Sequence, residues 1–273
     1  MANQVEREIE TAGGSVGVRA ERRGALAIWT IDRPDRRNAL SRSVVRELGR
    51  LAREGAKDPT LRAVIVTGAG DQAFCAGADL KERQGMVEEE VRDFLSLYRV
   101  SLRDLDRMPV PVIAAIDGVA FGGGLELALA CDLRIASRAA QLGLTETSLG
   151  IIPGAGGTQR LTRELGPARA KDLILFARRL SAEEALAYGI VQRLAEPGKR
   201  ALDAAIEWAQ PLLSGAPIAI SAALTAIDAA ADQPLEEGLS IERLCYERTL
   251  ASKDRLEALA AFAEKRKPVF KGE

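Results

Sequence analysis

Two glutamates, Glu126 and Glu146, lie twenty residues apart, each beside a glycine-bearing turn, in a chain that contains no histidine. Without imidazole there can be no Ser-His-Asp triad, no Cys-His dyad and no histidine-ligated metal. Acid and base chemistry near neutral pH then falls to carboxylates or, less often, to Lys, Tyr or Cys. The pair is therefore the leading candidate for acid and base catalysis, and no metal site is predicted. Spacing alone does not prove that the two side chains meet, and Glu146 could be a surface carboxylate.

Three glycines precede Glu126 in the segment FGGGLELALAC and lead into a predicted helix. Backbone N–H groups can approach a ligand closely at such a turn, with the positive end of the helix dipole behind them. The pattern predicts an anion or oxyanion site. The alternative is a plain tight turn, with Glu126 in the first helical turn because negative charge is favourable there.

A second turn of small residues, FCAGADLK, could aim its amides at the same ligand oxygen. Two donors from two different strand ends are what a two-donor oxyanion hole requires. The alternative is a plain strand-to-helix connection with Asp79 as the helix cap. The glycine-rich segment IIPGAGGTQR lacks the Lys-Ser/Thr ending of a P-loop and does not complete GxGxxG, which argues against nucleotide sites.

Repeated strand-turn-helix units must position these residues. Three short apolar runs are each followed by turn formers and a helical stretch. The runs span residues 25–32, 63–67 and 112–117. Apolar residues at helical spacing predict one amphipathic helix over 41–57, with Ser41 as its candidate cap, and a second over 88–107. The repetition predicts an α/β fold in which both helices form layers on a sheet.

The second half of the chain is predicted to be mainly helical, with one further strand at 190–194. A capping box at Ser181 and Glu184 opens a helix there. From about residue 200 the chain is Ala-rich and helical, with interruptions at prolines. These are Pro211, Pro217 and Pro234. We predict a core of residues 1–200 that carries the site, and a C-terminal helical region, 201–273, whose apolar faces need the core or another subunit to cover them.

The composition is that of an ordinary globular protein, with 273 residues, 47% hydrophobic and 28% charged residues, and a formal charge of −1. This charge balance demands neither nucleic acid nor a membrane surface. Three cysteines without CxxC spacing fit reduced thiols in the core. The N-terminal stretch has no signal- or transit-peptide pattern, and no apolar run approaches membrane-spanning length. The sequence therefore predicts a cytoplasmic protein without a membrane segment.

A basic stripe along the first predicted helix suggests a different function. It consists of Arg42, Arg46, Arg50, Arg53 and Lys57. Such a stripe could follow the phosphates of a nucleic acid. The interleaved Glu47 and Glu54, the lack of aromatic residues for base stacking and the neutral whole-chain charge favour a solvated helix face instead. We therefore expect no nucleic-acid partner.

Four segments together resemble the crotonase (enoyl-CoA hydratase/isomerase) superfamily. They are FCAGADLKER, PVIAAIDGVAFGGGLELALACDLRIA, LGLTETSLGIIPGAGGTQRL and KDRLEALAAFAEKRKPVFKGE. The resemblance covers nearly the whole chain and is strongest to the 3-methylglutaconyl-CoA hydratases of leucine catabolism, a group that includes the AU-rich-RNA-binding homologue of animals. It implies a spiral of ββα units followed by a C-terminal helical region, and a homotrimer or a homohexamer.

The resemblance also implies the roles of individual residues. The amides of Ala78 and Gly123 match an oxyanion hole for the thioester carbonyl. Glu126 would activate the water that adds to Cβ, and Glu146 would supply the proton to Cα. The expected contacts to coenzyme A (CoA) are Ala76, Lys81, Arg33 and Ala39, together with Phe262 and Lys265, which would reach the CoA of a neighbouring subunit. CoA is part of the substrate, so no separate cofactor is expected.

Retention of both glutamates favours hydration or its reverse, because superfamily members that only isomerise or dehalogenate usually lack one. We expect reversible syn addition of water to 3-methylglutaconyl-CoA, giving 3-hydroxy-3-methylglutaryl-CoA. The alternatives are a general short-chain enoyl-CoA hydratase and an RNA-binding protein that has kept the scaffold. A glutaconyl chain ends in a carboxylate that needs a cation or a helix N-terminus. The candidate cations, in a segment expected to form a lid, are Arg83, Lys81 and Arg92.

Overall fold

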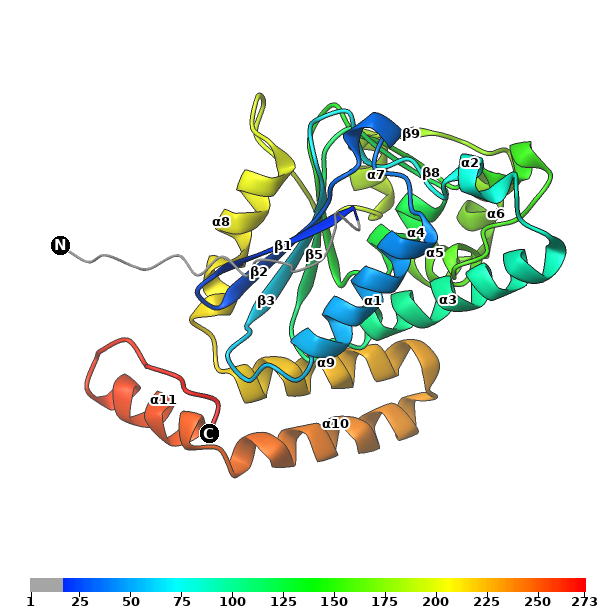
Figure 1. Ribbon diagram of the computed structural model, residues 1–273. Coiled ribbons are helices and arrows are strands. Elements are labelled where there is room, and N and C mark those ends of the chain that lie inside the picture. Colours follow the sequence, from blue (N-terminus) through cyan, green and yellow to red (C-terminus); the bar gives the residue numbers. More distant parts are fainter. Residues whose placement is uncertain (1–16) are drawn as a thin grey trace.

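A six-stranded sheet forms the centre of the computed structural model, which describes residues 17–273 (Figure 1). The N-terminal stretch, on which the predicted cellular location partly depends, lies outside these residues. In spatial order the strands are β1 (Val18–Arg23), β2 (Leu26–Ile31), β3 (Ala63–Gly68), β5 (Val112–Ile116), β7 (Leu133–Ala136) and β10 (Arg193–Leu194). All neighbours pair in parallel except β1 and β2. The predicted α/β architecture is confirmed.

A second sheet of four short strands carries the turns that form the site. Its strands, in order, are β4 (Ala73–Cys75), β6 (Val119–Phe121), β8 (Gln141–Gly143) and β9 (Leu180–Ser181). Strands of two or three residues leave no periodic signal in a sequence, so none of these was predicted. Because β4, β6 and β8 pair in parallel, their carboxyl ends meet at one edge. Ala78, Gly123 and Glu146 follow these ends and are thereby brought together.

Two long helices cover one face of the large sheet. They are α1 (Arg42–Gly55) and α3 (Glu88–Asp106), within two residues of the predicted ranges. The Ser41 side chain accepts a hydrogen bond from the Val44 N–H and caps α1, as predicted. Val44 and Leu48 of α1 and Leu102 of α3 are buried in the core beneath them. This layer fixes the position of α3, whose other side chains reach the site.

The opposite face of the large sheet is covered by α8 (Ala201–Leu213). Ala201, Ala205 and Ala209 are fully buried there, and such small side chains let the helix lie close to the strands. The region predicted as a C-terminal helical appendage therefore contributes its first helix to the core of the sheet. The predicted interruption at Pro211 was wrong, since this proline lies near the end of α8, where its ring costs one hydrogen bond without ending the helix.

The remaining C-terminal helices extend away from the sheets (Figure 1). They are α9 (Pro217–Asp232), α10 (Leu235–Leu250) and α11 (Lys253–Ala263). Large apolar side chains on them are exposed, among them Ile227, Leu244, Leu259 and Phe262. Among the described helices, none is by itself long and apolar enough to cross a membrane; only α8 and α9 taken together, bent by 111°, pass that test.

Short helices surround the second sheet. They are η1 (Pro34–Arg36), α2 (Leu80–Arg83), α4 (Gly123–Leu129), η2 (Glu146–Leu149), α5 (Gly157–Leu165), α6 (Pro167–Leu175) and α7 (Ala182–Tyr188). The predicted capping box at Ser181 and Glu184 is present at the start of α7. The strand predicted at 190–194 was too long. The amides of Ile190 and Val191 donate back to Ala185 in α7, so they are not free to join a sheet.

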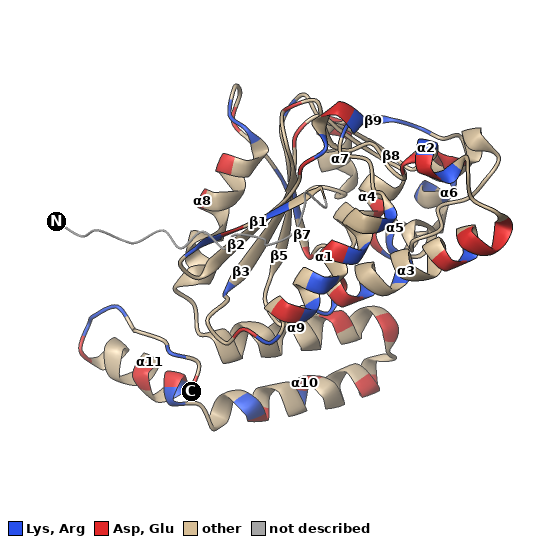
Figure 2. Cartoon of the chain, in the orientation of Figure 1, with Lys and Arg blue, Asp and Glu red and all other residues tan. Residues whose placement is uncertain are grey.

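The basic stripe on α1 is interleaved with acidic residues (Figure 2). Arg50 forms ion pairs with Glu47 and Glu54 of the same helix, and Arg53 pairs with Asp104 of α3. These pairs give acidic partners to two of the five cations of the stripe, Arg50 and Arg53. The three cysteines are free and buried, as predicted.

Candidate active site

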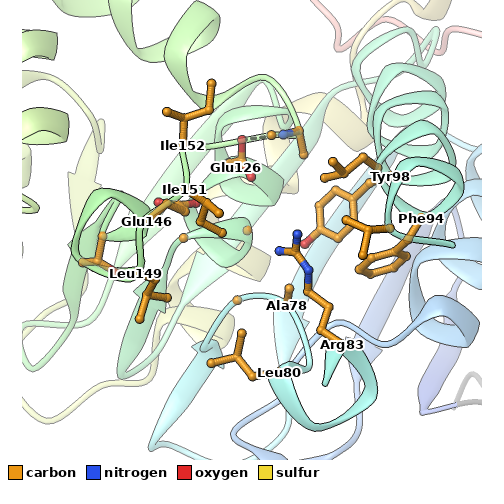
Figure 3. A pocket seen from close by; sticks show the side chains of 18 of the residues that line it. Ala78, Leu80, Arg83, Phe94, Tyr98, Glu126, Glu146, Leu149, Ile151 and Ile152 are labelled. Atoms are coloured by element: carbon orange, nitrogen blue, oxygen red, sulfur yellow. Dashed lines mark hydrogen bonds between the residues drawn. The ribbon is translucent and has the colours of Figure 1, made fainter. Parts of the chain in front are cut away.

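A cavity of about 640 Å³ lies between helix α3 and the turns that follow β4, β6 and β8. Five of the predicted site residues line it: Ala76, Ala78, Gly123, Glu126 and Glu146. Figure 3 shows the two glutamates on one side of the cavity, facing Tyr98 and Arg83 on the other. The convergence that sequence spacing could not prove is therefore present. Apart from these polar groups the wall is mainly aliphatic and aromatic, as expected for a site that binds an acyl chain.

The turn after β4 is held by backbone bonds to a distant segment. Leu40 donates its N–H to the Gly77 carbonyl at 2.8 Å and accepts from the Asp79 N–H at 3.0 Å. Gly77 has a φ of +104°, which favours glycine. The Asp79 side chain caps α2, so the plain reading of this turn as a strand-to-helix connection is also correct. These bonds tie the turn to Leu40, and Ala78 lines the cavity.

The turn after β6 places a second amide beside the first. A Cβ added to Gly123 would lie 3.5 Å from the Ala78 nitrogen, so the two backbones are neighbours. In the described part of the chain, neither the Ala78 nor the Gly123 N–H donates to another backbone group. Glycine at position 124 lets this turn approach β4, because a Cβ added there would lie 2.1 Å from the Cys75 carbonyl oxygen. Two unused N–H donors at one point of a cavity form the outline of an oxyanion hole.

Glu126 is fixed by backbone donors from the turn before α5. Its Oε1 accepts hydrogen bonds from the Ala155 N–H at 2.7 Å and the Gly157 N–H at 2.8 Å. The residue is 3% exposed, and burial raises the pKa of its carboxyl while these two donors oppose the rise. Gly157 leaves room for this contact, since a Cβ there would lie 2.9 Å from Glu126 Cγ. One carboxylate oxygen is thus anchored and the other is left for chemistry.

Glu146 begins η2 and is also buried, but its Oε2 has no hydrogen-bond partner in residues 17–273. Burial, followed by the negative charge of Glu126, raises the pKa of Glu146 to about 7. Glycine at position 122 allows the close approach of this side chain, because a Cβ added there would lie 3.1 Å from Glu146 Oε1. A carboxyl that titrates near neutral pH can act as either acid or base under working conditions.

The predicted CoA contacts fall into three groups. Ala76 lines the cavity, whereas Lys81 is an exposed residue of α2 that follows the lining residue Leu80 in the chain. Arg33 donates to Asp79 Oδ2 at 2.8 Å and to the Ala39 carbonyl at 2.7 Å, so this pair helps to hold the Ala78 turn.

Phe262 and Lys265 belong to the third group, which the single chain does not bring to the cavity. Phe262 is 86% exposed on α11, which lies away from the second sheet (Figure 1). Lys265 follows α11 with a φ of +54°.

Besides the two glutamates, the polar side chains that line the cavity are those of Arg83, Tyr98 and Thr145. Arg83 was one of three candidate cations, and its guanidinium points into the cavity (Figure 3). Arg92, another candidate, pairs with Glu88 on the exposed side of α3 and is not among the residues that line the cavity. The sequence placed Tyr98 only within the amphipathic helix predicted over 88–107. The sequence hints at a role for Tyr98 in one way only: it puts a hydroxyl group on the helix face that packs against the core, where an aliphatic side chain could pack equally well.

Taken together, these groups can polarise a carbonyl oxygen, move protons with two carboxyls and enclose an apolar chain. In residues 17–273, no three His, Cys, Asp or Glu side chains are grouped so as to hold a metal ion. Among the groups that line the cavity, those suited to proton transfer or to binding an anion are the two carboxyls, the two amides, the tyrosine and the arginine.

Known proteins share both the sequence and this architecture. Residues 21–273 match the family described as Enoyl-CoA hydratase/isomerase. The mitochondrial methylglutaconyl-CoA hydratase of Rattus norvegicus is 45% identical over 256 residues, covering 93% of this chain and 81% of the relative. The enoyl-CoA isomerase/hydratase fer4 of Mycosarcoma maydis is 46% identical over 250 residues, covering 89% of this chain and 91% of the relative.

A crystal structure of enoyl-CoA hydratase from Bacillus anthracis superimposes with a TM-score of 0.91 at 46% identity. The match covers 94% of this chain and all of the other. The crotonase-type fold that the sequence motifs implied is confirmed by this similarity. The chain belongs to the enoyl-CoA hydratase/isomerase family, that is, to the crotonase superfamily.

Proposed function

We propose that this protein hydrates an enoyl-CoA thioester, and that its substrate is 3-methylglutaconyl-CoA, which it converts reversibly to 3-hydroxy-3-methylglutaryl-CoA. The observation that carries the proposal is the meeting of two buried glutamates and two unused backbone amides in one cavity. A family that includes both hydratases and isomerases leaves the reaction open. Two carboxyls favour hydration, because hydration needs two proton transfers at different places. One group must take a proton from the attacking water, and another must give a proton to Cα.

In the proposed reaction, the thioester oxygen accepts hydrogen bonds from the Ala78 and Gly123 N–H groups. Glu126 takes a proton from a water molecule while the oxygen of that water bonds to Cβ. At the same time the electrons of the C=C bond move toward the thioester. Glu146 gives its proton to Cα as that negative charge collapses. The amides stabilise charge that develops only during the reaction, which is how an oxyanion hole accelerates it.

Activity in both directions is expected to fall as the pH rises above about 7, where Glu146 ionises. Hydration starts with the proton on Glu146, and dehydration starts with it on Glu126, so both need a pair that holds one proton. Loss of that proton leaves two anions and no acid. The measurement is kcat/KM against pH in each direction. Activity that stays flat up to pH 9 would contradict the proposed proton count.

Arg83 supports the choice of a substrate with a terminal carboxylate. Its half-buried guanidinium lines a mainly apolar cavity and makes no hydrogen bond or ion pair with any residue of 17–273. An unpaired cation beside apolar walls is costly unless a ligand supplies the counter-charge. A neutral acyl chain has no group to meet it, whereas a glutaconyl chain carries a carboxylate at its far end.

Replacement of Arg83 by leucine is expected to lower kcat/KM for 3-methylglutaconyl-CoA by about 10- to 100-fold, the range for one hydrogen bond to a charged group. Turnover of 3-methylcrotonyl-CoA, which lacks only the carboxyl group, should not fall. The matched control is Arg99→Leu, which removes an exposed arginine from α3. Equal losses on both substrates would count against carboxylate recognition by Arg83.

The function itself is tested by kcat/KM of the unaltered protein with 3-methylglutaconyl-CoA and crotonyl-CoA. A preference for the branched dicarboxylate supports the proposal, and the rat relative named methylglutaconyl-CoA hydratase makes it the first substrate to try. A preference for crotonyl-CoA would instead favour a general short-chain hydratase. That second function is kept because other relatives are named only as isomerase/hydratase.

We also propose that the chain acts as a homotrimer or homohexamer. The exposed apolar side chains of α9, α10 and α11 need a cover, and a second copy of the chain would provide it. In such an assembly Phe262 and Lys265 would contact CoA bound to a neighbouring subunit. This arrangement would explain why α11 does not reach the cavity of its own chain.

A further inference from the structure

We propose that the Tyr98 hydroxyl is a third hydrogen-bond donor to the thioester oxygen, beside the amides of Ala78 and Gly123. This inference rests on the proposed function insofar as it takes the ligand to be an acyl-CoA thioester. The oxyanion hole would then consist of two backbone amides and one side-chain hydroxyl from α3. Tyr98 would contact the reacting thioester in addition to packing in the core.

The position of the hydroxyl is set by close packing on both sides. A Cβ added to Gly123 would lie 2.3 Å from Tyr98 Oη, so the hydroxyl stands directly against the backbone of that residue. The same hypothetical Cβ would lie 3.5 Å from the Ala78 nitrogen. The ring is held by an edge-to-face contact with Phe94, with centroids 5.5 Å apart and planes at 89°. The hydroxyl is therefore held against the Gly123 backbone, at a point that the Ala78 nitrogen also approaches.

The hydroxyl lacks a partner although it is buried. Tyr98 is 3% exposed, and buried tyrosine hydroxyls usually find a hydrogen-bond partner because an unpaired one costs about 1 to 3 kcal/mol. In residues 17–273, two buried side-chain atoms have no partner: Tyr98 Oη and Glu146 Oε2. Both belong to residues that line the same cavity. Two unsatisfied groups at one cavity point to a ligand that satisfies them, and Tyr98 needs an acceptor.

The hydroxyl remains a donor throughout the working range. Burial first, and then the neighbouring Cys75, Glu126 and Glu146, raise the pKa of Tyr98 well above its ordinary value, while Arg83 opposes the rise. A protonated phenol donates one hydrogen bond. The thioester oxygen is the acceptor that would lie next to Gly123, and its negative charge grows during the reaction. The bond therefore strengthens as the reaction proceeds.

The test is Tyr98→Phe, which removes the hydroxyl and keeps the ring. We expect kcat to fall by about 10- to 100-fold, less than the 10²- to 10³-fold typical for one oxyanion donor, because two amides remain. KM should change little. The melting temperature should stay the same or rise, since the variant removes an unsatisfied polar atom rather than a bond. The matched control is Tyr188→Phe, on α7 outside the cavity.

A spectroscopic readout separates this inference from the proposed function. A donor to the thioester oxygen polarises a conjugated acyl group, so bound 2,4-hexadienoyl-CoA should absorb at longer wavelength than the free ester. The spectra are recorded in Glu146→Gln protein, which slows turnover, with and without Tyr98→Phe. A smaller shift in the double variant supports the inference, even if the unaltered protein hydrates none of the thioesters offered. An unchanged shift with unchanged kcat would overturn it.

Discussion

Replacement of Glu126 or Glu146 by glutamine is expected to lower kcat by about 10²- to 10⁴-fold, the range for a positioned acid or base. Glutamine has nearly the same shape, and at position 126 its carbonyl oxygen can still accept from the Ala155 and Gly157 N–H groups. What is lost is the ability to take up or release a proton. Steady-state kinetics with an enoyl-CoA substrate measures the effect, and KM should change little because neither carboxyl is needed to hold the CoA.

Folding is not expected to suffer in the Glu146→Gln variant. The pKa of Glu146 is raised by burial, so its ionised form above pH 7 destabilises the folded state, and glutamine removes that cost. The melting temperature at pH 8 should therefore stay the same or rise. Glu89→Gln, an exposed carboxyl on α3, is the matched control. Turnover within threefold or so of normal in either site variant would rule out its proposed role.

A methyl group at Gly123 is expected to lower kcat by about 10²- to 10³-fold, as does the loss of one oxyanion donor. The new Cβ would lie 2.3 Å from Tyr98 Oη and 3.2 Å from its Cζ. Because Phe94 and α3 hold the ring, the Gly123 amide or the tyrosine must move, and either shift spoils the geometry at the thioester oxygen. The measurement is kcat for Gly123→Ala with the substrate that the unaltered protein prefers.

The control for this change is Gly238→Ala. Gly238 lies inside α10, and a Cβ there would meet nothing within 4 Å, so a small gain in helix stability is expected. Adding Tyr98→Phe to Gly123→Ala removes the closest clash and should recover part of any lost melting temperature. Near-normal kcat in Gly123→Ala alone would mean that the amide at this position does not contact the reacting carbonyl.

The helices and the central strands were predictable because their signals are local. The spacing of Val44 and Leu48, with Ser41 ahead of them, indicates a capped amphipathic helix, and α1 has that form. The motifs around Glu126 and Glu146 indicated both the family and the residues that now line one cavity. Absence of histidine narrowed the chemistry further. In these respects short-range pattern and side-chain chemistry agreed with the structure.

Other features depend on contacts between distant segments. The second sheet is built from strands too short to show a period, yet its parallel pairing is what brings Ala78 beside Gly123. The bonds from Leu40 to the Ala78 turn join segments that no local signal connects. Tyr98 looked like any buried residue on an amphipathic helix until its hydroxyl proved to lack a partner. Likewise, only the structure shows that Arg83 lines the cavity whereas Arg92 pairs with Glu88.

The central claim is that the paired glutamates add water to a carbon–carbon double bond. The most direct measurement is turnover of 3-methylglutaconyl-CoA in H₂¹⁸O, followed by mass spectrometry of the acyl product. We predict a product heavier by one water molecule, with the ¹⁸O in the hydroxyl at Cβ, and loss of this product in Glu126→Gln. A product of unchanged composition with a shifted double bond would show an isomerase and contradict the account.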